Sequence, residues 1–193
     1  MKSTKPKYNQ IIEAAVKVFA ENGYHGSQVS KIAKAAGVAD GTIYLYFKNK
    51  EDILITVFKE KMGQFIEEIA LATGKQVSAE KKLFTLIDMH IKQLSNDHDL
   101  AIVTQLELRQ SNVTLRRQIN QVLKPYLTMI DNIINVGIES KQFRKDINVP
   151  LMRQMIFGTL DEIVTNWVMK EHKYDLVSQV PQVHALLIHG LRS

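Results

Sequence analysis

Apolar residues recur every three or four positions along nearly the whole chain of 193 residues. This is the period of an amphipathic α-helix. No stretch alternates apolar and polar residues for long, so strands are not expected. The sequence therefore predicts an all-α protein. The expected helices cover about residues 8–22, 27–36, 39–47, 50–73, 79–95, 99–111, 113–139, 149–170 and 176–191.

The functional interpretation depends most on residues 29–50, VSKIAKAAGVADGTIYLYFKNK. A first short helix should end at Gly37, because glycine accepts the left-handed backbone of a tight helix exit. A second helix should begin near Asp40, with Ile43 and Tyr46 on its inner side. Two short helices joined in this way are typical of a helix-turn-helix, although a helical hairpin in a protein core has the same spacing.

Charge favours the DNA-binding interpretation. Residues 1–50 contain eight Lys and three acidic residues, whereas residues 51–193 contain equal numbers of basic and acidic residues. The formal excess of +5 thus lies entirely in the segment with the helix-turn-helix pattern, as expected for a phosphate-binding surface. We therefore expect a helix-turn-helix DNA-binding domain over residues 1–50 and a helical ligand-binding and dimerisation domain over residues 51–193.

Residues that begin or end helices support these boundaries. Gly23 follows Asn22 and should supply a left-handed stop to the first helix. Ser27 or Gln28 is expected to begin the helix that follows, with Ser27 the better cap, and Ser78 can cap the helix beginning near residue 79. Pro150 suits the first turn of a helix, where its missing N–H costs nothing.

Composition excludes several classes of protein. The chain has no cysteine, so it has neither disulfides nor thiolate metal sites. No apolar run approaches the ~18 residues that span a membrane. The basic N-terminus MKSTKPKYNQ lacks the apolar core of a signal peptide. We expect a cytoplasmic protein that makes no use of a membrane.

No pattern in the sequence predicts an enzyme. His90 and His98 are eight residues apart, which does not give metal ligands at positions i and i+4 of one helix face. There is no glycine-rich phosphate loop and no nucleophile elbow. We therefore expect no catalytic residue, metal or cofactor. The other His and Asp residues considered are best explained as solvated loop residues: His90, Asp97, His98, Asp99, His184 and His189.

The last two predicted helices are unusually apolar. The helix over 149–170 carries apolar residues all round, which requires cover on both sides. Pairing with a second copy of the chain would form a two-fold interface. Ile163 and Leu187 are expected on its exposed side. The alternative, that both helices form the core of a monomer, is compatible with the same periodicity.

The segment NGYHGSQVSKIAKAAGVADGTIYLYFKNKEDIL is similar throughout to the N-terminal signature of TetR-family transcriptional repressors, over about residues 8–58. The resemblance implies a homodimer whose recognition helices enter successive major grooves of a pseudo-palindromic double-stranded operator. It also implies an inducer pocket in the C-terminal domain.

The same resemblance implies particular DNA contacts. Residues expected near base edges are Ser30, Asp40, Gly41 and Thr42; those expected at phosphates are Tyr44, Tyr46, Lys48 and Lys50. Asp40 departs from the Ser or Lys of many members, and an acid there could accept a hydrogen bond from a cytosine amino group. Leu45 replaces a frequent aromatic residue and is expected to pack inward.

Three further segments, QLELRQSN, RQMIFGTLDEIVTNWVM and KYDLV, resemble members of this family that control fatty-acid degradation in Gram-positive bacteria and are released from DNA by acyl-CoA. This resemblance implies a long-chain acyl-CoA effector, with an apolar slot for the chain and Arg for the phosphates. The residues expected to line the slot are Leu106, Met155, Phe157, Leu160 and Trp167. Those expected at its mouth are Arg109, Arg116, Arg117 and Arg153. The alternative is a drug-efflux regulator of the same family with another hydrophobic ligand, a cation near Asp161 and Glu162.

Overall fold

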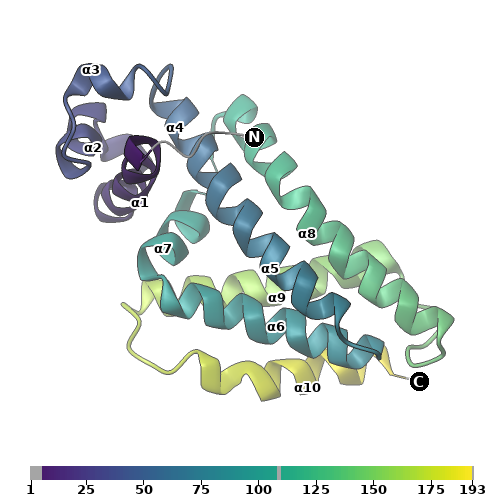
Figure 1. Ribbon diagram of the computed structural model, residues 1–193. Coiled ribbons are helices and arrows are strands. Elements are labelled where there is room, and N and C mark those ends of the chain that lie inside the picture. Colours follow the sequence, from purple (N-terminus) through teal and green to yellow (C-terminus); the bar gives the residue numbers. More distant parts are fainter. Residues whose placement is uncertain (1–5, 108–109, 193) are drawn as a thin grey trace. The chain divides into compact units, whose positions relative to one another are not determined.

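The computed structural model describes residues 6–107 and 110–192. All regular structure within these ranges is helical, which confirms the predicted all-α fold (Figure 1). The elements are α1 Pro6–Gly26, α2 Val29–Ala35, α3 Asp40–Ile43, α4 Lys50–Val57, the π-helical turn η1 Phe58–Met62, α5 Gly63–Gly74, α6 Ala79–Asn96, α7 His98–Glu107, α8 Val113–Glu139, α9 Val149–Met169, the 3₁₀ turn η2 Val177–Gln179 and α10 Val180–Leu191.

The described chain forms two compact units. The first comprises residues 1–63 and 99–122, and the second comprises residues 64–98 and 123–193, each within the described ranges. The chain passes between the units three times, after residues 63, 98 and 122, and the helical stretches around the first and last of these points depart from regular α-helix. The first contains the π-helical turn η1 before Gly63, and the last contains Pro125 inside α8, where the ring removes one backbone donor.

In the first unit α1, α2 and α4 pack around a small apolar core. Ile11, Phe19, Ile32 and Ile43 are almost completely buried there. The helical part of α1 ends at Gly23, whose φ of 65° and ψ of 164° break the helix as predicted. Gly37 has the same φ of 65°, which confirms the predicted turn.

Two local predictions in the first unit are wrong. Ser27 does not cap α2, whose N-cap is Gln28 without a side-chain hydrogen bond. The buried Ser27 hydroxyl instead lies 2.6 Å from the carbonyl oxygen of Gly23 and 3.0 Å from that of Val18, so it stabilises the end of α1. Leu45 does not pack inward, since 80% of it is exposed. The reason is that α3 ends at Ile43 and the following turn directs residue 45 outward.

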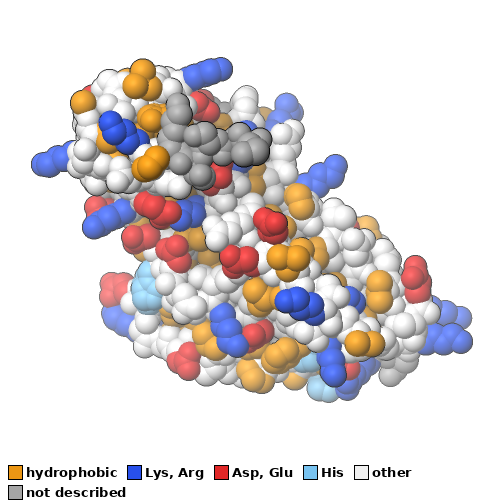
Figure 2. All heavy atoms as spheres, viewed as in Figure 1, with side chains coloured by type: hydrophobic (Ala, Val, Ile, Leu, Met, Phe, Trp, Pro, Cys, Tyr) orange, Lys and Arg blue, Asp and Glu red, His pale blue; other side chains and the backbone are white. Residues whose placement is uncertain are grey.

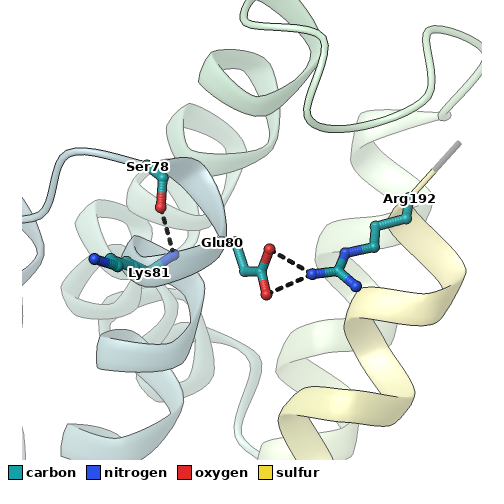
Figure 3. A network of polar contacts seen from close by, with 4 residues as sticks. All are labelled: Ser78, Glu80, Lys81 and Arg192. Atoms are coloured by element: carbon teal, nitrogen blue, oxygen red, sulfur yellow. Dashed lines mark hydrogen bonds and ion pairs between the residues drawn. The ribbon is translucent and has the colours of Figure 1, made fainter.

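In the second unit, α6 contacts both α9 and α10. The caps predicted here are confirmed. Ser78 Oγ accepts from Lys81 N at the start of α6, and Pro150 lies in the first turn of α9, which begins at Val149. Arg192, just after α10, donates from Nη2 to both carboxylate oxygens of Glu80 at 2.7 Å (Figure 3). This hydrogen bond lowers the pKa of Glu80 and joins the end of α10 to the start of α6.

Candidate DNA-binding surface and effector-binding residues

The residues predicted to contact DNA lie at or near the surface of the first unit, from which basic side chains project outward (Figure 2). Ile43 is fully buried and anchors the short helix α3, so that the residues on either side of it face solvent. The exposed members of the set are Ser30, Asp40, Gly41, Tyr44 and Lys48, and the half-buried ones are Thr42, Tyr46 and Lys50.

Tyr46 belongs to a group of aromatic rings beside the start of α1. Its ring centroid lies 6.1 Å from that of Tyr8, which in turn stacks on Phe47 at 5.6 Å. The Tyr8 hydroxyl donates to Glu60 Oε1 at 3.1 Å. Burial, followed by this bond and the charge of Glu60, raises the pKa of Tyr8 to about 12. Tyr8 therefore remains a neutral donor at pH 7 and holds α1 against η1.

Lys50 has a structural role that the sequence did not reveal. Its ammonium donates to the carbonyl oxygens of Tyr24, Ser27 and His25, at 2.7, 2.9 and 3.3 Å. It also lies 4.5 Å from the centre of the Tyr24 ring. An ammonium has three donors, and all three are used here. Lys50 thus fixes the turn between α1 and α2 from the first residue of α4.

Glu107 holds the same turn through the backbone N–H of Tyr24. The residue is 8% exposed, and its Oε1 accepts the backbone N–H of Tyr24 at 2.8 Å across 83 residues of sequence. The side-chain amide of Gln110 donates to Oε2, and the Arg116 guanidinium donates to the Gln110 carbonyl at 3.2 Å. These bonds connect the end of α7 and the start of α8 to the α1–α2 turn.

The effector candidates in residues 99–122 are mostly exposed. Leu106 on α7 is 49% exposed, and Arg116 and Arg117 lie on the solvent side of α8. Arg109, the first choice for the phosphates, lies outside the described residues.

The candidates on α9 do not share one face. Met155 is 52% exposed, whereas Leu160 is fully buried in the core. Trp167 is also buried, and its indole N–H donates to the Tyr174 carbonyl at 2.9 Å, so it fixes the loop after α9. Arg153 is paired with Asp131 of α8 at 2.6 Å. Phe157 is half-buried and packs edge-on against Tyr126.

Phe157 is part of a cluster contributed by four helices, which we call the His90 cluster: Phe65 of α5, His90 of α6, Tyr126 of α8 and Phe157 of α9. His90 Nδ1 and the Tyr126 hydroxyl are 2.8 Å apart, and Phe65 lies edge-on to the His90 ring at 5.3 Å. Burial lowers the pKa of His90 to about 4 and raises that of Tyr126, so both are neutral at pH 7.

The interpretation of His90 as a solvated residue is wrong, since it is 4% exposed. The sequence carried a signal for this, because His90 continues the apolar stripe of Leu83, Ile87 and Leu94 at helical spacing. His98, by contrast, is exposed, and its ring stacks on His172 and packs edge-on against Trp167. No group of three or more potential metal ligands occurs among the described residues.

A small pocket opens between α5, α6 and α8 of the second unit, with Thr73, Lys82 and Met129 in its lining. Its volume is about 180 Å³, below the roughly 300–1,000 Å³ of typical small-molecule sites.

Two family models match the chain. Residues 11–57 match the model for bacterial regulatory proteins of the tetR family, and residues 58–190 match the one described as "YsiA-like protein, C-terminal region". The chain belongs to the TetR family of bacterial regulators. This confirms the resemblance seen in the sequence and the prediction of a transcriptional regulator rather than an enzyme.

Individual relatives of this TetR-family regulator are similar over its whole length. The fatty acid metabolism regulator protein of Bacillus subtilis is 60% identical over 193 residues, which is 100% of both chains. Two solved structures are also 60% identical and cover 96% of this chain and 100% of their own. They are the fatty acid degradation regulator FadR from Bacillus halodurans, with a TM-score of 0.91, and FadR from Bacillus subtilis in complex with stearoyl-CoA, with a TM-score of 0.92.

In the described part of this TetR-family chain, no helix is both long and apolar enough to cross a lipid bilayer.

Proposed function

We propose that this TetR-family chain is a homodimeric repressor of genes for fatty-acid degradation, and that long-chain acyl-CoA releases it from a pseudo-palindromic operator in the cytoplasm. The observation that carries the proposal is the 60% identity over the full length to a fatty acid metabolism regulator. The choice of effector is supported by the solved structure of Bacillus subtilis FadR, which is 60% identical to this chain and is in complex with stearoyl-CoA.

DNA recognition is assigned to the domain over residues 1–50. Base edges are approached by Ser30, Asp40, Gly41 and Thr42, and phosphates by Tyr44, Tyr46, Lys48 and Lys50. The exposure of Tyr44 and Lys48 supports their part. Lys50 can bind a phosphate only by giving up at least one of its three carbonyl partners, of which that to His25 is the longest at 3.3 Å.

Effector binding and dimerisation are assigned to residues 51–193. The acyl chain is proposed to lie among Leu106, Met155, Phe157, Leu160 and Trp167, and the CoA phosphates to meet Arg109, Arg116, Arg117 and Arg153. Arg153 would then exchange Asp131 for a phosphate. Such an exchange is reasonable because guanidinium groups bind phosphate through paired hydrogen bonds.

The dimer is proposed to form through α9 and α10. Support comes from large apolar side chains that these helices leave exposed: Leu151 is 55%, Met169 68% and Leu186 69% exposed. Leu187, chosen from the sequence as an exposed position, is only 9% exposed and belongs to the core of its own chain. The outward position on α10 is its neighbour Leu186.

Release from DNA requires the effector to prefer a conformation that binds the operator poorly. A hundredfold loss of operator affinity corresponds to about 2.7 kcal/mol of coupling, within the usual range. By reciprocity, operator DNA must weaken acyl-CoA binding by the same factor.

The test uses a duplex that the protein itself selects from a random DNA pool. The complex is titrated, with fluorescence anisotropy as the readout, against acyl-CoAs of 12 to 20 carbons, CoA alone and free fatty acids. We expect release by acyl-CoA that improves with chain length, by up to ~0.8 kcal/mol per buried methylene. If no acyl-CoA releases the DNA at micromolar concentration, the effector assignment is wrong.

A further inference from the structure

The His90 cluster contains a buried polar atom with no partner. His90 Nε2 is inaccessible to solvent and makes no hydrogen bond to any described residue. Leaving such a group unpaired costs free energy, so each case in a native protein calls for an explanation. Here the atom lies where α5, α6, α8 and α9 converge, among the rings of Phe65 and Tyr126.

The neighbouring hydroxyl determines which ring nitrogen carries the proton. Tyr126 has one O–H, and among the described residues its only hydrogen-bond partner is His90 Nδ1, at 2.8 Å. The hydroxyl is satisfied as a donor only if Nδ1 accepts. The single proton of the neutral ring is then on Nε2, which becomes a buried donor without an acceptor.

We propose that His90 Nε2 donates a hydrogen bond to the thioester carbonyl oxygen of a bound acyl-CoA. This inference rests on the proposed effector and identifies a polar contact within its apolar site. The acceptor must be an uncharged oxygen attached to an apolar chain, because the surroundings of the ring are aromatic and a carboxylate would lose its hydration there. The cluster thus favours an acyl thioester over a free fatty acid, and Tyr126 acts as a positioning residue that keeps the proton on Nε2.

The test compares two ligands that differ only at the proposed contact. Stearoyl-CoA has the carbonyl oxygen, whereas S-octadecyl-CoA has a methylene in its place. Their dissociation constants are measured by isothermal titration calorimetry with the full-length protein. We expect the wild-type chain to bind stearoyl-CoA more tightly, on the order of tenfold. Equal affinities would mean that a buried water, and not the ligand, satisfies His90, and would overturn the inference.

Two variants separate the two functions of the His90 ring, which are to accept a hydrogen bond from Tyr126 and to donate one from Nε2. In His90→Asn, the shorter amide can still accept from Tyr126 but presents no donor at the position of Nε2. In His90→Gln, the longer side chain places an amide N–H near that position. We expect His90→Asn to bind both ligands equally, and His90→Gln to recover part of the preference for stearoyl-CoA. A preference that survives unchanged in His90→Asn would assign the carbonyl to another donor.

The outcomes separate this inference from the proposed function. If neither ligand binds the wild-type chain, the acyl-CoA assignment itself is wrong. If both bind equally, the effector assignment stands and only the role of His90 is lost. The wild-type comparison requires no substitution, so it decides the question even if a variant fails to fold.

Discussion

At the scale of single residues, the α1–α2 turn depends on side chains that come from distant parts of the sequence. Gly23 interrupts α1, and the carbonyl groups that follow need donors from elsewhere. Lys50 supplies these donors, and Glu107 accepts the N–H of Tyr24. The sequence indicated the turn through Gly23, but it could not indicate partners 26 and 83 residues away.

Substitution of Lys50 separates its structural role from a role in DNA binding. Lys50→Met removes three hydrogen bonds from a charged donor, so we expect the free energy of unfolding in urea to fall by about 2 kcal/mol. If Lys50 also contacts a phosphate, its loss reduces the steepness of the salt dependence: the magnitude of the slope of log K for DNA binding against log salt concentration falls by about 0.9. Lys48→Met, at an exposed position, is the control. Lys48→Met should reduce the magnitude of the salt slope without loss of stability. Unchanged stability in Lys50→Met would contradict the role of Lys50 in fixing the α1–α2 turn.

Buried His90 should make stability depend on pH. Burial lowers its pKa from 6.5 to about 4, so the folded state binds fewer protons than the unfolded state between these values. The stability that depends on a neutral His90 is therefore fully present above about pH 6.5. It is lost as the pH falls toward 4, by about 3 kcal/mol in total. Urea unfolding at pH 7.5 and 4.5 should show the stability difference between wild type and His90→Asn narrowing at the lower pH. A constant difference would show that His90 is accessible to protons in the folded state.

At the scale of elements, helix positions followed from the apolar period, and most ends followed from glycine, proline and capping residues. The deviations occur where local and tertiary requirements differ. The chain over 50–73 has the apolar period of one helix, yet it contains the π-helical turn η1. A π-turn is defined by backbone hydrogen bonds five residues apart, which the side-chain pattern does not report. Ser27 looks like a cap, but its hydroxyl is used by carbonyls of α1.

The same limits apply to the candidate site. Exposure of Tyr44 and Lys48 could be expected from the helix-turn-helix pattern, because the pattern itself defines an open face. The slot residues could not be separated from core residues by periodicity, and Leu160 and Trp167 are both buried. Whether Glu107 Oε1 and His90 Nε2 find a hydrogen-bond partner depends on how the helices pack, which no local sequence pattern encodes.

The link from α7 to the α1–α2 turn can be tested through Glu107. One oxygen of the Glu107 carboxylate accepts from Tyr24 N–H and the other from the Gln110 amide. Glu107→Gln replaces one of these oxygens by an NH₂ group, so a donor would face a donor. We expect the chain to lose about 1–2 kcal/mol of stability and the Tyr24 amide to exchange its hydrogen faster. Glu21→Gln, on the exposed side of α1, should change neither property. Unchanged exchange at Tyr24 in Glu107→Gln would show that the carboxylate is not needed to hold the turn.

At the scale of the whole molecule, the exposed apolar residues of α9 and α10 lead to a prediction about assembly. Apolar side chains reach the surface of the second unit, including over α10 (Figure 2). At a two-fold interface each residue occurs twice. Replacing Leu186 by Glu would therefore remove two buried leucines, at about 1.5–3 kcal/mol each. The expected weakening of the dimer is thus about 3–6 kcal/mol, or roughly 100- to 20,000-fold in the dissociation constant.

Sedimentation velocity at micromolar concentration should find the wild-type chain dimeric and Leu186→Glu and Leu151→Glu monomeric, with helical circular dichroism retained. Val77→Glu is the matched control, because Val77 is 94% exposed and lies between α5 and α6. That variant should remain a dimer. Leu187→Glu should instead lower the stability of each chain, since residue 187 is buried within it. Loss of the dimer should also abolish tight operator binding, because a monomer reads a single half-site. A wild-type monomer, or dimers in both the Leu151 and Leu186 variants, would exclude this interface.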